Sequence, residues 1–116
     1  MTTLAQVLAI LKGRRFDLQN EKVLQLQLAQ AFEAAALPAQ REVSLSPASI
    51  IDFMVGSIGV EVKIKGTPKA IYQQCQRYCE SEHITSLLLL TNKQVRLPAS
   101  LHGKHTHVFN LGLSWL

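Results

Sequence analysis

Residues 49–65 of this 116-residue chain have the sequence SIIDFMVGSIGVEVKIK. Branched aliphatic residues lie on both sides of Gly56-Ser57, and glycine at the first of two loop positions is typical of a type II′ hairpin turn. We therefore predict two antiparallel strands, over residues 49–55 and 58–65, joined by this turn.

Pairing in such a hairpin follows from the length of its loop. The numbers of paired residues sum to a constant, so one predicted face is apolar and holds the pairs Val55–Ile58, Phe53–Val60 and Ile51–Val62. The other face holds Met54–Gly59, Asp52–Glu61 and Ile50–Lys63. A slip of one residue would turn one strand over and destroy the apolar match, which favours this register.

Asp52 and Glu61 are the unusual pair in this register. Like charges whose Cβ atoms lie roughly 4.5–5.5 Å apart destabilise a hairpin unless something neutralises them, and Lys63 on the same face is near enough to help. Two converging carboxylates also suit a hard divalent cation such as Mg²⁺, which completes its shell with water and phosphate oxygens. The alternative is an ordinary solvated cluster of three charges, although the apolar neighbours of Asp52 argue against its exposure.

Periodicity and capping residues predict the remaining elements. Helices are expected over residues 3–11, about 18–36, and 67 to about 82. Strands are expected over residues 41–46, 84–91 and 105–111. Residues 84–91 form a nearly continuous apolar run, which is typical of a strand buried on both faces. The order α-α-β-β-β-α-β-β predicts an α/β (α+β) fold in which a mixed sheet is flanked by helices.

Length and composition set the broad class of the protein. We expect one domain over residues 1–116, with an N-terminal helix and basic segment in residues 1–15 and a core over residues 18–111. The chain has 47% hydrophobic and 17% charged residues, which excludes a mainly disordered state. No apolar run approaches the ~18 residues of a membrane span. Cys75 and Cys79 lie one helical turn apart and do not suggest a disulfide framework, which favours a cytoplasmic location.

The residues around the hairpin resemble the PD-(D/E)XK nuclease superfamily. The resemblance rests on Asp52, the hairpin and Glu61-Val62-Lys63, preceded by a helix with Glu21 and followed by a helix with Gln74 and Tyr78. It covers roughly residues 18–92 and implies a restriction-endonuclease-like core. The segment from Ile51 to Lys63, followed by Gln74 and Tyr78, is similar to small phage and prophage nucleases and to resolvase-like members of this superfamily. The resemblance extends to the virus-type replication-repair branch, although Ile51 stands where that branch usually keeps proline before the aspartate.

The resemblance implies a nuclease that uses Mg²⁺ or Mn²⁺ to hydrolyse phosphodiester bonds. Asp52, Glu61 and the backbone carbonyl of Val62 would bind the metal, and Lys63 would position the attacking water and stabilise charge on the phosphate. Glu21 would hold a metal-bound water or a second metal. Gln74 would orient Lys63 or a phosphate oxygen. The residues alone also allow a structural interpretation of both. The carboxylate of Glu21 can be stabilised by the positive end of the helix dipole, and Gln74 can be an interior amide whose hydrogen bonds are made within the protein.

A nuclease also needs a surface for nucleic acid, for which we expect DNA rather than RNA. The net charge of +4 fits a polyanionic partner. The predicted contacts are Lys65, Lys69, Arg77, Arg14 and Arg15. Except at Lys65, which the register places on the face of Glu61, scattered charges that serve solubility are the alternative. We also expect a homodimer, because one small domain offers one site whereas duplex cleavage acts on two strands.

Two other readings of the function remain open. The chain could be a non-catalytic nucleic-acid-binding or assembly subunit that keeps the nuclease fold. It could also be an interaction module that docks or dimerises through the aliphatic side chains of residues 4–11, although these can equally cap the core.

Two further clusters contain metal-ligand residues. His102, His105 and His107 are one, and Cys75, Cys79 and His83, spaced by four along the third predicted helix, are the other. Surface histidines and packing cysteines are the ordinary interpretation of both.

Overall fold

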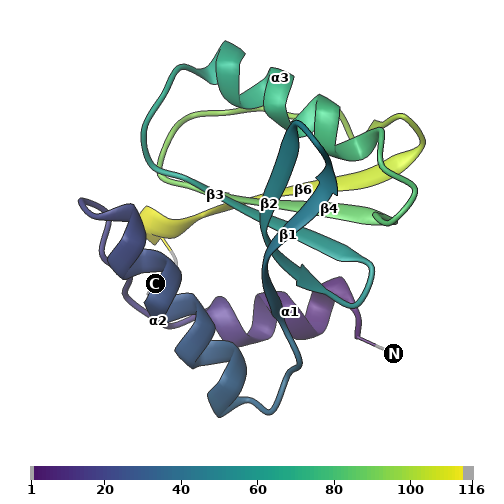
Figure 1. Cartoon of the computed structure of the whole chain (residues 1–116). Coiled ribbons are helices and arrows are strands. Elements are labelled where there is room, and N and C mark those ends of the chain that lie inside the picture. Colours follow the sequence, from purple (N-terminus) through teal and green to yellow (C-terminus); the bar gives the residue numbers. More distant parts are fainter. Residues whose placement is uncertain (1, 114–116) are drawn as a thin grey trace.

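The computed structural model describes residues 2–113 and contains one mixed six-stranded sheet (Figure 1). The strands are β1 (Gln40–Ser46), β2 (Ser49–Val55), β3 (Ile58–Lys63), β4 (Ser86–Thr91), β5 (Ser100–Leu101) and β6 (Lys104–Asn110), and their order in the sheet is β1-β2-β3-β4-β6-β5. The first three form an antiparallel meander. Strands β3, β4 and β6 are parallel, and β5 pairs with β6 in a short antiparallel hairpin.

Helices cover both faces of this sheet. Helices α1 (Leu4–Leu11) and α2 (Glu21–Ala34) lie on one face and α3 (Pro68–Cys79) lies on the other, while the short 3-10 helix η1 (Leu111–Leu113) follows β6 (Figure 1). Each α-helix begins with a capping side chain that accepts a backbone N–H, and these caps are Thr3, Asn20 and Thr67. The predicted mixed sheet flanked by helices is therefore confirmed. No helix within residues 2–113 is long and apolar enough to cross a membrane.

Strand β4 is the centre of both hydrophobic clusters. Leu88 and Leu90 pack toward α1 and α2, whereas Leu87 and Leu89 pack toward α3, and all four are fully buried. This confirms the prediction of a strand buried on both faces. Because β3 pairs with β4 along its whole length, the strand that carries Glu61 is held rigidly in the interior.

Helix α1 caps the core. Its residues Val7 and Leu11 are fully buried in the same cluster as Leu24 and Leu28 of α2. The aliphatic side chains of α1 are therefore largely used within the chain, which favours the capping interpretation over a docking face.

Several predicted boundaries differ from the observed ones. Helix α2 begins at Glu21 instead of Leu18, because the Asp17 carboxylate accepts the N–H groups of Gln19 and Asn20 and holds this segment in a turn. Helix α3 ends at Cys79, short of residue 82. Strand β3 ends at Lys63, so Lys65 lies in a bend and not on the strand face where it was expected. The short strand β5 was not predicted.

The register of the β2–β3 hairpin is confirmed at its turn end. A type II′ turn requires positive φ at its first central residue only. Gly56 has φ +62, and Ser57 does not have positive φ. The pairs Phe53–Val60, Met54–Gly59 and Val55–Ile58 form as predicted.

The predicted pairing of Ile51 with Val62 on the apolar face is wrong. Val62 packs with α1 and α2, but Ile51 packs beneath α3 on the opposite face of the sheet. Strand β2 reverses its faces at Asp52, and β1 does so at the matching position, Glu42, whose φ is +52. Because both strands reverse together, the pairing of Val43 with Ile51 keeps the register.

Candidate active site at the β2–β3 gap

The main-chain pairing of β2 and β3 ends at Phe53–Val60. Beyond that pair, the carboxylates of Asp52 and Glu61 accept the backbone hydrogen bonds between the two strands. The N–H of Asp52 donates to Oε1 of Glu61 at 3.2 Å, and the N–H of Val62 donates to Oδ2 of Asp52 at 2.8 Å. Side chains thus satisfy backbone groups that a continued ladder would have paired. The structure brings Asp52 and Glu61 together through these side-chain hydrogen bonds, whereas the predicted ladder pairs Asp52–Glu61 and Ile50–Lys63 do not form.

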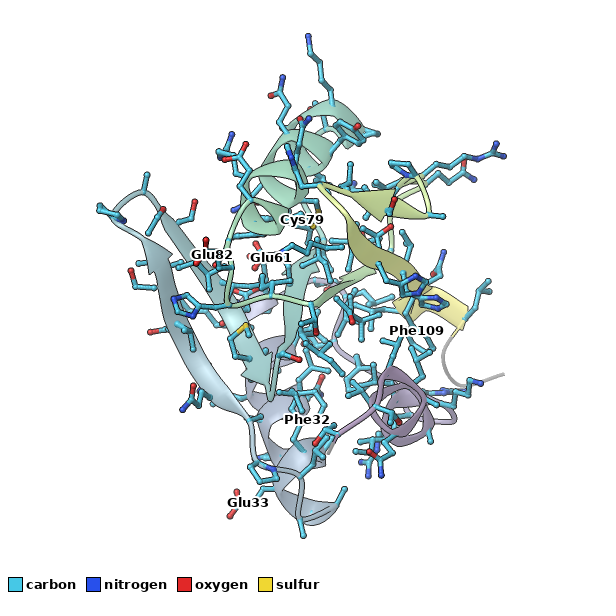
Figure 2. All side chains as sticks on the ribbon, turned by 90° about the vertical axis from the view of Figure 1, so that its right-hand side faces the viewer. Phe32, Glu33, Glu61, Cys79, Glu82 and Phe109 are labelled. Atoms are coloured by element: carbon cyan, nitrogen blue, oxygen red, sulfur yellow. The ribbon has the colours of Figure 1, made fainter. Side chains whose placement is uncertain are left out.

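Helices from both faces of the sheet contact this pair. From α2, Nε2 of Gln25 donates to Oδ1 of Asp52 at 3.3 Å. From α3, the hydroxyl of Tyr78 lies 2.9 Å from Oε2 of Glu61. Figure 2 shows Glu61 inside the molecule beneath α3. All four carboxylate oxygens of the pair therefore accept hydrogen bonds from the protein.

Gln74 reaches the pair only through Tyr78. Its Nε2 donates to the Tyr78 hydroxyl at 2.8 Å, and that hydroxyl also lies 3.0 Å from the carbonyl oxygen of Ile50. The single hydroxyl proton can serve Glu61 or Ile50 at one time. The partly buried amide of Gln74 therefore orients Tyr78, and among residues 2–113 it forms no hydrogen bond with Lys63.

Lys63 connects the buried pair to solvent. Its Nζ lies 3.8 Å from Oε2 of Glu61, and its side chain is 27% exposed whereas that of Glu61 is 3% exposed. The ammonium is therefore the charged group of this cluster that a solvent-borne anion meets most easily.

Glu21 stands beside the pair but not within it. It lies in the first turn of α2, and its Oε1 accepts the N–H of Ile64 at 3.4 Å, just beyond the end of β3. This contact ties the start of α2 to the strand that carries Glu61 and Lys63. Both the helix-end interpretation and a role near the pair agree with this position.

Burial dominates the electrostatics of the pair. Burial, followed by the negative charge of Asp52, raises the pKa of Glu61 to about 8. Burial also raises the pKa of Asp52, against the opposing effect of the Val62 N–H. Without a cation the pair therefore holds a proton near neutral pH. Burial, and next the Glu61 charge, raise the pKa of Tyr78, which keeps its hydroxyl protonated and able to donate.

The site offers a divalent cation two carboxylates, those of Asp52 and Glu61, and no third acidic, histidine or cysteine ligand among residues 2–113. Within residues 2–113 no three His, Cys, Asp or Glu side chains are placed to hold one metal ion. Glu21 does not complete a triad with Asp52 and Glu61, and neither the histidine cluster nor the Cys75, Cys79 and His83 series forms such a group. Mg²⁺ needs only one or two carboxylates, and a cation would offset the burial of charge that raises both pKa values and the Asp52 charge that adds to it at Glu61. Asp52 and Glu61 therefore fit it.

The five predicted nucleic-acid contacts lie in three parts of the chain. Lys65 follows β3, Lys69 and Arg77 are on α3, and Arg14 and Arg15 follow α1; all five are exposed. Nε of Arg14 donates to the carbonyl oxygen of Ile10 at 2.8 Å, so part of its donor capacity is used within the chain.

Gln25 and Tyr78 are the site residues for which sequence reasoning assigned no role. Gln25 follows Glu21 by four residues and Tyr78 follows Gln74 by four, so each lies one helical turn from a predicted site residue on the same helix face. That spacing is the signal that could have found them. What it could not show is which helix face meets which carboxylate.

Comparison with known proteins adds no relative. No family matches the sequence, and no curated protein or solved structure is significantly similar to the chain.

Proposed function

We propose that this chain is a metal-dependent nuclease with a restriction-endonuclease-like core that hydrolyses phosphodiester bonds in DNA. The observation that carries the proposal is the Asp52–Glu61 pair, which fills the gap between β2 and β3 with Lys63 at 3.8 Å from Glu61. A buried pair of acids with raised pKa values is costly for a fold. Such a cost is typical of functional sites.

The arrangement of elements supports the same proposal. A helix with Glu21, an antiparallel meander, the helix α3 and a parallel strand follow one another, which is the order that the resemblance to PD-(D/E)XK nucleases implies. The acids and the lysine stand on neighbouring central strands. A homodimer is part of the proposal, since two such sites would act on the two strands of a duplex.

Each residue of the site has a distinct role in this proposal. Asp52 and Glu61, with the carbonyl of Val62, hold the Mg²⁺ or Mn²⁺ ion, and Gln25 and Tyr78 orient the two carboxylates. The ion, when bound, supplies Lewis acidity and lowers the pKa of water. Lys63 offers its partly exposed ammonium to the phosphate and stabilises the negative charge that develops there.

Cleavage of a panel of nucleic acids tests the proposal. Single-stranded, duplex, flap and four-way junction DNA are incubated with Mn²⁺ and either the wild-type chain or Asp52→Asn, which keeps the shape of the side chain. We expect the variant to lose at least about 100-fold in rate, because losing an outer-shell partner of a metal already costs 10–100-fold. Glu33→Gln is the matched control, since this exposed acid of α2 projects away from the site (Figure 2). Equal activity of wild type and Asp52→Asn would refute the assignment.

A second candidate is a non-catalytic nucleic-acid-binding or assembly subunit. It is favoured by the hydrogen bonds that already occupy all four carboxylate oxygens and by the 2% exposure of Glu61. Calorimetric titration with Mn²⁺ separates the candidates. A nuclease binds the ion through Asp52 and loses that binding in Asp52→Asn, whereas a folded wild-type chain that binds no Mn²⁺ supports the second candidate.

A further inference from the structure

Cations gather where the parallel strands β3 and β4 end. After Glu61 the only acidic residues of the sequence are Glu80 and Glu82, which lie between α3 and the amino end of β4. Cations follow the opposite, carboxyl ends of β3 and β4, and these are Lys65, Lys69, Lys93 and Arg96. The amino edge also carries Lys104 at the start of β6, whose Nζ donates to the carbonyl oxygen of Ser81 and offsets the two acids there. The four cations at the carboxyl edge outnumber Glu21, which lies beside the end of β3, so this edge is the more positive one and Lys63 is its innermost cation.

One groove lies on this edge, two strands from Lys63. Its lining consists of Lys93, Gln94, Val95, Arg96, Val108 and Asn110, around an open volume of about 560 Å³. Thr91 pairs with both Lys63 and Asn110, so these three residues form a row across β3, β4 and β6. With strands about 4.8 Å apart, Asn110 is about 10 Å from Lys63 along that row.

The groove and the carboxylate pair are on the same face of the sheet. Val95 and Val108 pack with the cluster beneath α3, and Tyr78 of α3 reaches Glu61 from that side. Asn110 follows Val108 by two residues and Lys63 follows Glu61 by two, so all four point to this face. A strand of nucleic acid with a rise of about 3.4 Å per nucleotide would cover the 10 Å in about three steps.

The groove has donors for phosphate and no platform for bases. Lys93, Gln94 and Arg96 are exposed, and among residues 2–113 neither cation forms an ion pair. Thr91 accepts the N–H of Lys93 through Oγ1 at 3.0 Å, which anchors the start of this loop. Because no aromatic residue lines the groove, stacking of bases is not its chemistry.

We propose that this groove binds the phosphate backbone of the nucleic acid next to the scissile bond, through Lys93 and Arg96. The inference rests on the proposed function, because it places the substrate strand over Lys63. Contacts of this kind position the strand and read no sequence. Lys93 and Arg96 thus join Lys65 and Lys69 on one positive edge, whereas Arg14, Arg15 and Arg77 lie elsewhere in the chain.

The salt dependence of DNA binding tests the groove. Fluorescence anisotropy of a labelled duplex, without divalent metal, is measured from low to high salt for wild type, Lys93→Ala, Arg96→Ala and the double variant. We expect the slope of log K against log salt to fall in magnitude by about 0.9 per cation removed. Arg41→Ala is the matched control, since it removes an exposed arginine that lies over the Phe53 ring, away from this edge.

Each outcome decides between the proposals. Three outcomes would overturn the proposal that the groove binds phosphate. The salt-dependence slope could be unchanged in the double variant, Arg41→Ala could have the same effect as Arg96→Ala, or the wild type could fail to bind DNA. Thermal melts of the variants exclude unfolding as the cause of lost binding. If the groove variants bind weakly but wild type cleaves nothing with Mn²⁺, the groove stands and the nuclease fails. If Asp52-dependent cleavage occurs with normal binding in the double variant, only the groove fails.

Discussion

Glu61 is a titratable carboxyl group that is 2% exposed in the middle of the fold. Its environment raises its pKa from an ordinary 4.5 to about 8 through burial and the charge of Asp52. The folded chain therefore holds a proton that the unfolded chain releases at neutral pH, so the folded state binds more protons. The contribution of Glu61 to the free energy of unfolding of the metal-free protein is then fully present below pH 4.5 and is lost as the pH rises through about 8.

Glu61→Gln tests this pH dependence. Urea unfolding between pH 5 and 9, in the presence of a chelator, should show stability declining with pH in the wild type and a flatter profile in Glu61→Gln, because the amide does not titrate. Glu33→Gln should keep the wild-type decline. An equally steep decline in Glu61→Gln would show that another group is responsible.

Tyr78 is the second residue whose chemistry can be isolated. Tyr78→Phe keeps the ring in the core but removes the hydroxyl between Glu61 and Ile50. We expect a loss of about 1–3 kcal/mol in the free energy of unfolding, because buried acceptors are left without their donor. We also expect Mn²⁺ binding, measured by calorimetry, to weaken about 10–100-fold.

The control for this substitution is Tyr72→Phe on the same helix, at a partly buried tyrosine outside the pair. It should leave Mn²⁺ affinity unchanged. Equal affinities for Tyr78→Phe and wild type would mean that the tyrosine only fills space.

At the scale of elements, the reversal of β2 at Asp52 depends on a glycine in β3. Ile51 occupies the face beneath α3 because Gly59 leaves room for it; a Cβ added at Gly59 would lie 2.7 Å from Cδ1 of Ile51 and 2.8 Å from Cδ1 of Ile84. Gly59→Ala should therefore lower the free energy of unfolding by about 1–3 kcal/mol through overpacking. Urea denaturation measures the loss.

A double-mutant cycle with Ile51→Val checks the cause of that loss. The smaller side chain should cost less stability in the Gly59→Ala background than in wild type, because it relieves the crowding. Purely additive effects would show that Ile51 and Gly59 do not compete for the same space.

At the scale of the whole molecule, the site exists because three layers meet at one gap in the sheet. Helix α2 contributes Gln25 from one face and α3 contributes Tyr78 from the other, while β2 and β3 supply the acids between them. The same topology carries Lys65, Lys69, Lys93 and Arg96 to the carboxyl edge, whereas Glu80 and Glu82 share the amino edge with Lys104. A polyanion approaching Lys63 therefore meets the positive edge first.

Short-range order in the sequence was sufficient for the turn at Gly56, the pairing of Phe53 with Val60 and the doubly buried strand β4. It also indicated that Asp52 and Glu61 are neighbours, but not that side-chain hydrogen bonds in place of ladder pairing join them. Loop length and alternation act over a few residues, and any fold must obey them. The roles of Asp52, Glu61 and Lys63 in catalysis stay predictions, as do the metal and the dimer.

Tertiary structure alone decided the reversal of faces at Asp52, the position of Ile51 beneath α3, and the hydrogen bonds from Gln25 and Tyr78. These features depend on which helix packs on which face of the sheet and on the space at Gly59. The two hydrogen bonds join residues that are 27 and 17 positions apart in the sequence. A periodic pattern marks the buried side of an element but does not name its partner. The partner is chosen by packing of the complete core, where volume and hydrogen-bond satisfaction must hold at every position together.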